Sequence, residues 1–275
     1  MAFATGACAM DAGETGELDI ESESAELGGG WFIPNNFPIL NENGLAATYS
    51  TEGYLDLGSE FFQEQGTNGR DCTSCHRPDE GWSITPQRVQ LLFLLTGGTH
   101  PIFDTRDGNS PDHDYSTVQA RWNSYSMLLQ GLFRRSRPIP AGADFELVAV
   151  DDPHGFANAD AIVTYRRPLA STNLFLYHTL MWDDRNTVGD DLRAGLRKQA
   201  NGNVTGAQEG PEADPAVIED IVDFEIALST AQTVLFGVGR LDVAGARGGP
   251  EHLANQAFEV GPFDIYDAWA NTGSP

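Results

Sequence analysis

Apolar residues recur at helix-like spacing in five segments of the chain, and this pattern predicts five α-helices. The clearest of them begins at Asp214, which can cap a helix, and Pro215, which suits its first turn. Thr85 and Pro86 begin another helix in the same way, and Gly97 ends it. The predicted helices are 51–65, 85–97, 116–133, 189–203 and 214–233.

One region follows a two-residue period instead. Phe145, Leu147 and Ala149 occupy alternate positions, a turn-rich stretch follows, and the β-branched segment 161–167 comes next. This pattern predicts two short strands joined by a loop, as a β-hairpin insertion at about 144–168. The sequence therefore predicts a mainly α fold with one small hairpin and long loops.

The first thirty residues differ from the rest in composition. Residues 1–30 are rich in Asp, Glu, Ser and Gly and contain little to bury, so we expect an acidic disordered tether before one domain at 31–275. Cys8 follows Thr5-Gly-Ala, which is similar to a bacterial lipoprotein cleavage site, although Thr5 replaces the usual Leu and no apolar signal segment precedes it. A lipid anchor at Cys8 and a free tail cysteine are the two alternatives.

The charge of the chain restricts its partners. The 275 residues include 40 Asp and Glu but only 16 Lys and Arg, which gives a formal net charge of −24. This charge disfavours nucleic acid, whose affinity for proteins depends on phosphate neutralisation. It would attract a basic protein and speed the encounter at low salt, or it serves solubility alone. No apolar run approaches the ~20 residues of a membrane span, so no span is expected.

The motif with the most specific chemistry is Cys72-Thr-Ser-Cys75-His76. Its spacing is typical of c-type haem attachment. The two thiols can form thioethers with the two vinyl groups of haem, and the adjacent imidazole can ligate the iron. We therefore predict one covalent haem c held by these three residues. Export follows from this prediction, because bacteria attach haem c outside the cytoplasm.

Three other uses of a Cys-x-x-Cys pair fit less well. A zinc site needs four ligands, and apart from the pair only Cys8 and scattered histidines are available. A thioredoxin-like dithiol would follow a strand within a βαβ pattern, which the chain lacks. A plain disulfide would not require His76.

The second axial position of the iron determines what the haem could do. A Met or His there favours electron transfer, whereas an open position allows peroxide to bind. Candidates include His113 and Met127, although a methionine on a predicted helix more often fills the core. Met181 is the other methionine within the predicted domain.

Four stretches in order resemble the N-terminal half of the bacterial dihaem cytochrome c peroxidase family. The first, LGSEFFQEQGTNGRDCTSCHRPDEGWS, contains the CxxCH motif. It is followed by RWNSYSMLLQ, LMWDDRNTVGDDLRAGLRKQA and IEDIVDFEIALSTAQ, and the similarity spans about 57–232. In that family a CxxCH motif precedes an Asn-rich helix, a Trp-Asp-Gly-Arg element and a helix that contains Phe-Glu. The resemblance implies a cytochrome c-like helical haem domain.

The resemblance also implies roles for single residues. Trp182 matches the tryptophan between the two haems of the family, and Arg185 matches the arginine of the same element. His113 lies near the position of a histidine that leaves the iron on activation in some members. Core packing is the alternative role for Trp182. The chain departs from the family at Asp184, which replaces Gly, and it lacks the distal acid and a second CxxCH.

We therefore expect an exported monohaem cytochrome domain that transfers electrons. Two alternatives are a peroxidase that reduces hydrogen peroxide at an open iron, and a structural haem subunit of a larger assembly. The expected partner is a basic cytochrome or a separate haem domain, in the periplasm or outside the cell, with an outer-membrane lipoprotein as a variant of this location. Calcium is a further cofactor that the resemblance implies, with 104–114 as the segment that carries suitable oxygens.

Overall fold

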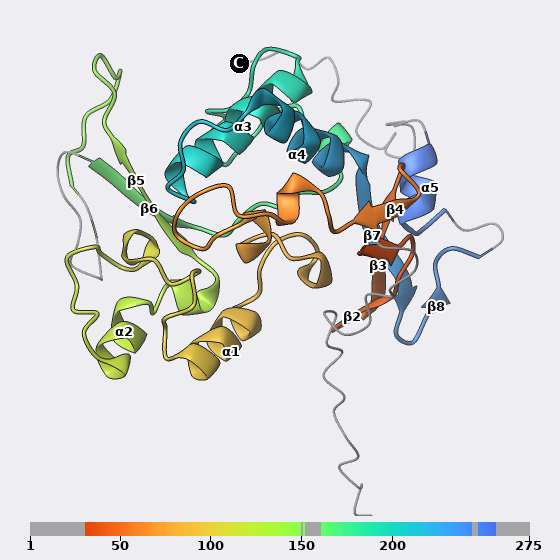
Figure 1. Ribbon diagram of the computed structural model, residues 1–275, viewed down its shortest axis with the longest axis horizontal. Helices are drawn as coiled ribbons and strands as arrows, with labels where there is room; N and C mark the ends of the chain where they lie inside the picture. The colour runs from red at the N-terminus through yellow and green to blue at the C-terminus, as the bar shows by residue number, and fades with distance from the viewer. Residues whose placement is uncertain (1–30, 150, 152–160, 244–246, 257–275) are drawn as a thin grey trace, which may run out of the picture.

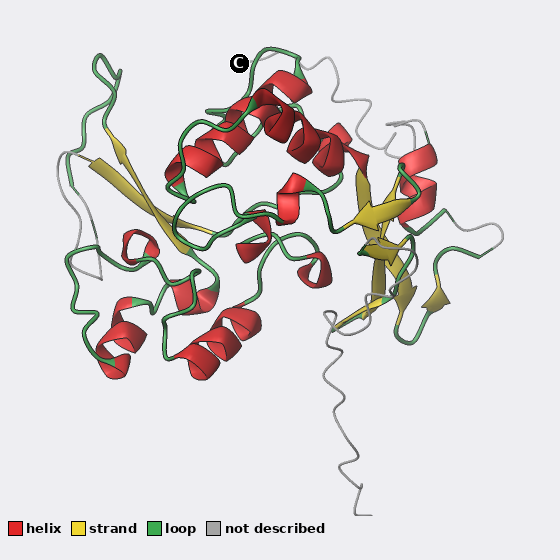
Figure 2. Ribbon diagram, viewed as in Figure 1, coloured by secondary structure: helices red, strands yellow, loops and turns green. Residues whose placement is uncertain are grey.

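A computed structural model describes residues 31–149, 151, 161–243 and 247–256. It contains 33% helix and 19% strand, with three antiparallel sheets, so the fold is mixed α/β (Figure 2). The prediction of a mainly α, cytochrome c-like fold with one hairpin is therefore wrong. The predicted tether at 1–30, with Cys8, lies outside the described residues.

The largest sheet has the strand order β2-β3-β7-β8 and joins segments far apart in the sequence. In β3–β7 pairing, Thr48 lies opposite Thr230. The helix predicted at 214–233 is therefore right only as far as Ala227, because the remaining residues belong to β7. Thr230 and Thr233 suit a strand once β3 supplies the hydrogen bonds. The bounds are β2 (Ile39–Asn41), β3 (Gly44–Ser50), β7 (Leu228–Leu235) and β8 (Gly239–Arg240).

A second, two-stranded sheet occupies part of the segment predicted as the helix 51–65. β1 (Phe32–Pro34) pairs with β4 (Tyr54–Asp56), and a single 3-10 turn, η1 (Glu60–Phe62), follows. The apolar spacing there is produced by one buried strand residue, Leu55, and one buried turn residue, Phe61. No α-helix forms over this segment.

The third sheet is the predicted hairpin, but its first strand lies earlier in the sequence. β5 (Phe133–Pro138) pairs with β6 (Ala161–Arg166), and the hairpin projects at the left of Figure 1. The described residues of 144–149, where we expected the first strand, have no regular structure. Phe133 anchors β5 in the core, whereas Phe145 is exposed.

Local signals locate the helices better. Thr85 caps α1 through a hydrogen bond to the Arg88 amide, and Gly97 ends it with a left-handed φ of 62°. The predicted helix 116–133 is shorter than expected, because the Asn109 side chain accepts a hydrogen bond from the Met127 amide where the chain turns. The helices are α1 (Pro86–Thr96), α2 (Val118–Ser124), α3 (Leu192–Gly206), α4 (Pro215–Ala227) and α5 (Pro250–Asn255).

Two hydrophobic clusters form the interior. The first packs α3 and α4, which lie side by side in Figure 1, against Phe61 and Trp82. The second packs α1 against the segments around Phe103 and Phe133. None of the described helices is long and apolar enough to cross a bilayer.

Candidate functional site

The cysteine motif forms one tight turn that its own side chains stabilise. Cys72 to Ser74 form a 3-10 turn, η2, capped by Asp71. The Asp71 carboxylate accepts hydrogen bonds from the Ser74 amide at 2.7 Å and the Thr73 hydroxyl at 2.8 Å. The His76 amide donates to the Cys72 carbonyl at 3.0 Å. The two residues between the cysteines therefore fold the motif and do not merely space it.

The turn lies where the two hydrophobic clusters meet. Cys72 is a buried member of the first cluster, while the half-buried Cys75 packs against the second. Both thiols are free, and burial raises the pKa of Cys75 to about 11 and that of Cys72 well above its usual range. Redox-active dithiols instead have lowered thiol pKa values. The environment thus disfavours a thioredoxin-like role.

The imidazole of His76 is held through one of its two nitrogens. Nδ1 lies 3.1 Å from the Trp82 carbonyl oxygen and 3.0 Å from the Ser171 hydroxyl oxygen. A carbonyl oxygen can only accept, so the proton is on Nδ1 and the lone pair is on Nε2. Burial lowers the pKa of His76, which the nearby carbonyls of Trp82 and Leu169 partly offset. A neutral imidazole fixed in this tautomer suits metal ligation.

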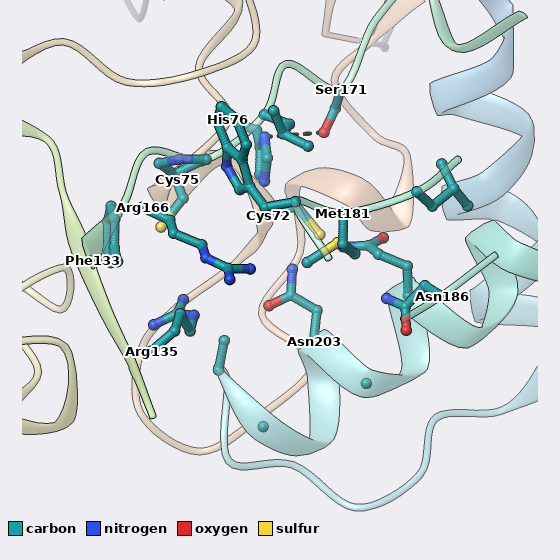
Figure 3. A pocket seen from close by; sticks show the side chains of 18 of the residues that line it. Cys72, Cys75, His76, Phe133, Arg135, Arg166, Ser171, Met181, Asn186 and Asn203 are labelled. Carbon is teal, nitrogen blue, oxygen red and sulfur yellow. Dashed lines mark hydrogen bonds between the residues drawn. The ribbon is translucent and has the colours of Figure 1, made fainter. Parts of the chain in front are cut away.

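A cavity of about 770 Å³ lies beside the motif, within the ~300–1,000 Å³ range of ligand sites (Figure 3). Cys72, Cys75 and His76 line it, and Leu196 and Phe133 bring the two clusters to its wall. His76 is the one histidine of this wall among the described residues, and Met181 is the one methionine. The cavity therefore offers one imidazole and one thioether.

The same wall collects positive charge. Nine of the sixteen basic residues of the chain line the cavity, with only three acidic residues among them. Figure 3 shows Arg135 and Arg166 on the same side of the cavity as Cys75. The basic residues are Arg70, Arg106, Arg134, Arg135, Arg137, Arg166, Arg167, Arg185 and Lys198.

A buried ion pair connects the motif to the hairpin. Arg70 donates to the Asp107 carboxylate at 2.7 Å and to the carbonyls of Pro101 and Ile102 at 2.7 and 2.8 Å. Asp107 also pairs with Arg135 on β5. The guanidinium of Arg70 is thus fully engaged two residues before Cys72, which fixes the entry to the turn.

Trp182 and Arg185 also line the cavity, but at its solvent edge. Trp182 is 59% exposed, and its indole N–H donates to the Arg167 carbonyl at 2.8 Å. Arg185 pairs with Asp183 at 2.5 Å, and the same carboxylate pairs with Arg166 at 3.2 Å. Trp182 is therefore not a core residue. These two residues lie on the same wall as the cysteine motif.

His113 and Met127 are not among the residues that line the cavity. Met181, Ser171 and Glu225, which do line it, were not assigned a role from the sequence. Glu225 had a detectable signal, because it continues the buried stripe of α4 at the spacing of Ile218, Ile221 and Val222. For Ser171 and Met181 no local signal exists, since both lie in irregular segments.

The described residues contain no group of three or more His, Cys, Asp or Glu that could hold a metal ion. The expected calcium site at 104–114 therefore has no cluster of ligands behind it.

No known protein family, curated protein or solved structure matches the chain. The geometry of the site is therefore the basis for any assignment.

Proposed function

We propose that this protein is a c-type cytochrome domain that transfers electrons through one covalently bound haem. The observation that supports the proposal is the position of the Cys72–His76 turn on a cavity whose wall includes one further thioether, Met181. A histidine with a methionine opposite it is the ligand pair of electron-transfer cytochromes c. Relationship to the dihaem peroxidase family and export from the cytoplasm are parts of the same proposal.

The residues of the cavity fit a haem in three respects. Cys72 and Cys75 carry neutral free thiols on the wall, each of which could add across one vinyl group. The lone pair of His76 is on Nε2, because Nδ1 is hydrogen-bonded. Arg135 and Arg166 could pair with the two propionates. When bound, the haem would supply a one-electron couple.

The solvent edge of the cavity is a suitable face for a redox partner. An exposed tryptophan among arginines is the residue combination that is enriched at binding hot spots. Arg137 strengthens this edge, since no described carboxylate lies within ion-pair distance of it. Burial and the guanidinium groups of Arg185, Arg135 and Arg166 lower its pKa. We therefore infer an acidic docking face on the partner, in place of the basic partner expected from net charge.

The experiment that tests the function compares two methionine variants in the protein matured with haem. Met181→Ala should abolish the weak long-wavelength band of a ferric methionine-ligated haem and give a high-spin spectrum. Met127→Ala, outside the cavity wall, should keep the parent spectrum.

Three results would overturn the proposal. The first is protein that gains no haem mass under maturation. The second is a parent protein with a high-spin ferric spectrum and rapid reaction with hydrogen peroxide, which would favour the peroxidase. The third is a spectrum that changes with Met127 and not with Met181, which would exclude the proposed ligand.

A further inference from the structure

Met181, labelled in Figure 3, lies at the start of a strained turn, 181–187, on the cavity wall. Met181 has a φ of 71° and Asp184 a φ of 58°, both in the left-handed region. Residues with a side chain seldom adopt this conformation, and it persists only where the surrounding structure holds it. Thr187 closes the turn, because its amide donates to the Asp184 carbonyl at 3.1 Å and its hydroxyl accepts from the Leu180 amide at 2.8 Å.

The second half of this turn is fixed to α3. Lys198 Nζ donates a hydrogen bond to the Arg185 carbonyl at 2.6 Å. Gly195 lies against the turn, since a Cβ there would come within 2.8 Å of the Asn186 carbonyl oxygen and 2.6 Å of a Leu180 methyl carbon. A side chain at this position of α3 would force the two segments apart. The first half of the turn depends on other contacts.

The first half of the turn is fixed to the hairpin by two side chains. The Asp183 carboxylate pairs with Arg166 of β6 at 3.2 Å and with Arg185 within the turn at 2.5 Å. The indole N–H of Trp182 donates to the Arg167 carbonyl, directly after β6, at 2.8 Å. The two residues that follow the methionine therefore both bind the end of β6.

Asp183 contributes its charge as well as its hydrogen bonds. Its two partners, Arg166 and Arg185, meet at one carboxylate, so without that carboxylate the two guanidinium groups would repel each other and push the turn away from β6. All three side chains are more than a quarter exposed, which makes each ion pair weak. A clamp of this strength can change a binding equilibrium severalfold and leave the fold intact.

We propose that Asp183 is a positioning residue for Met181, and that its clamp to β6 favours binding of the Met181 thioether to the haem iron. The inference rests on the proposed haem function. A turn that is already held in place loses little conformational freedom when its side chain binds, so the binding is tighter. Loss of the clamp should raise the fraction of protein in which the iron is open to another ligand.

The test is a titration of the ferric haem-loaded protein with imidazole, which competes with Met181 for the iron. At about pH 8 imidazole is mostly uncharged, so the charge of Asp183 does not attract or repel it directly. Asp183→Asn should raise the affinity for imidazole about threefold to tenfold and weaken the long-wavelength band of methionine ligation. Asp183→Glu, which keeps the charge, should stay closer to the parent protein than Asp183→Asn does.

Asp242→Asn is the matched control, because Asp242 forms an ion pair of similar exposure with Arg240, and neither residue lines the cavity. It should leave the affinity for imidazole unchanged. In the Met181→Ala background, Asp183→Asn should have no further effect.

The inference is overturned if Asp183→Asn and Asp242→Asn have equal effects, or if Asp183→Asn acts undiminished without Met181. If Asp183→Asn does not fold, Trp182→Phe removes the other contact to β6, and an unchanged affinity for imidazole in that variant overturns the inference. Parent protein without haem, or a spectrum that Met181→Ala does not change, would instead overturn the proposed function.

Discussion

Glu225 is a buried carboxyl group on the wall of the cavity. It is placed by the apolar stripe of α4, yet it is the one charged member of that stripe. Burial raises its pKa from the ordinary 4.5 to about 7, which the hydrogen bond from Ser171 only partly opposes. In the protein without haem, burial raises the pKa of the Cys72 thiol well above its usual range, and the nearby Glu225 adds to this rise.

The raised pKa predicts a pH dependence of stability that belongs to this residue. Because the folded pKa exceeds the unfolded one, the folded protein binds the proton more tightly. The stabilisation is complete below about pH 4.5 and is lost as pH rises through 7. It amounts to about 3 kcal/mol.

Urea unfolding of the haem-loaded protein at about pH 5 and about pH 8 measures this difference. The parent protein should lose between about 2 and 3 kcal/mol more than Glu225→Gln over this interval. Asp223→Asn, which removes a carboxylate from the exposed side of the same helix, should lose as much as the parent protein. Equal losses in the parent and Glu225→Gln would contradict the prediction.

At the scale of elements, α1 depends on signals contained within its own ends. Thr85 accepts a hydrogen bond from the Arg88 amide at 3.3 Å, and the Glu80 carboxylate accepts one from the Thr85 amide at 2.6 Å. At the other end Gly97 adopts the left-handed conformation that other residues avoid. Val89 and Phe93 then bury the inner face of the helix.

Removal of the N-terminal cap should weaken α1 without altering the fold. Thr85→Ala leaves the Arg88 amide without its side-chain acceptor and should lower the free energy of unfolding by about 1 kcal/mol. Gln87→Ala, on the exposed face of the same first turn, should change it by less than about 0.5 kcal/mol. Urea unfolding monitored by far-UV circular dichroism makes the comparison, and equal effects of the two changes would show that the cap does not stabilise the helix.

At the scale of the whole molecule, the two signs of charge are separated. The chain has a net charge of −24, but its basic residues gather on the cavity wall. An approaching acidic protein is therefore repelled by most of the surface and attracted only at the basic edge of the cavity. Such an arrangement steers orientation as well as rate.

The steering predicts a salt-dependent rate of electron transfer with an acidic small redox protein. Arg137→Gln should slow the second-order rate at low salt roughly twofold to fivefold, and the difference should vanish at high salt. Arg240→Gln on β8, an exposed arginine that does not line the cavity, should keep the parent rate. Stopped-flow kinetics provides the measurement. A faster reaction of the parent protein with a basic partner would contradict the inferred docking face.

The sequence by itself determined those features whose causes are local. The capping residues of α1 directly flank the helix, and Asp214 and Pro215 set the first turn of α4. The Cys72–His76 turn is capped by the residue that precedes it, Asp71. Each depends on hydrogen bonds between residues a few positions apart, so the pattern alone is informative.

Which distant segments meet depends on the tertiary fold and could not be predicted from local patterns. The segment 228–235 is a strand because β3 pairs with it. β6 pairs with 133–138 and not with 144–149. In the same way Ser171 contacts His76 from 95 residues further along the chain, and Met181 lines the same cavity. Strand pairing and cavity walls depend on contacts between segments far apart along the chain, and neither propensity nor spacing encodes which segment will supply them.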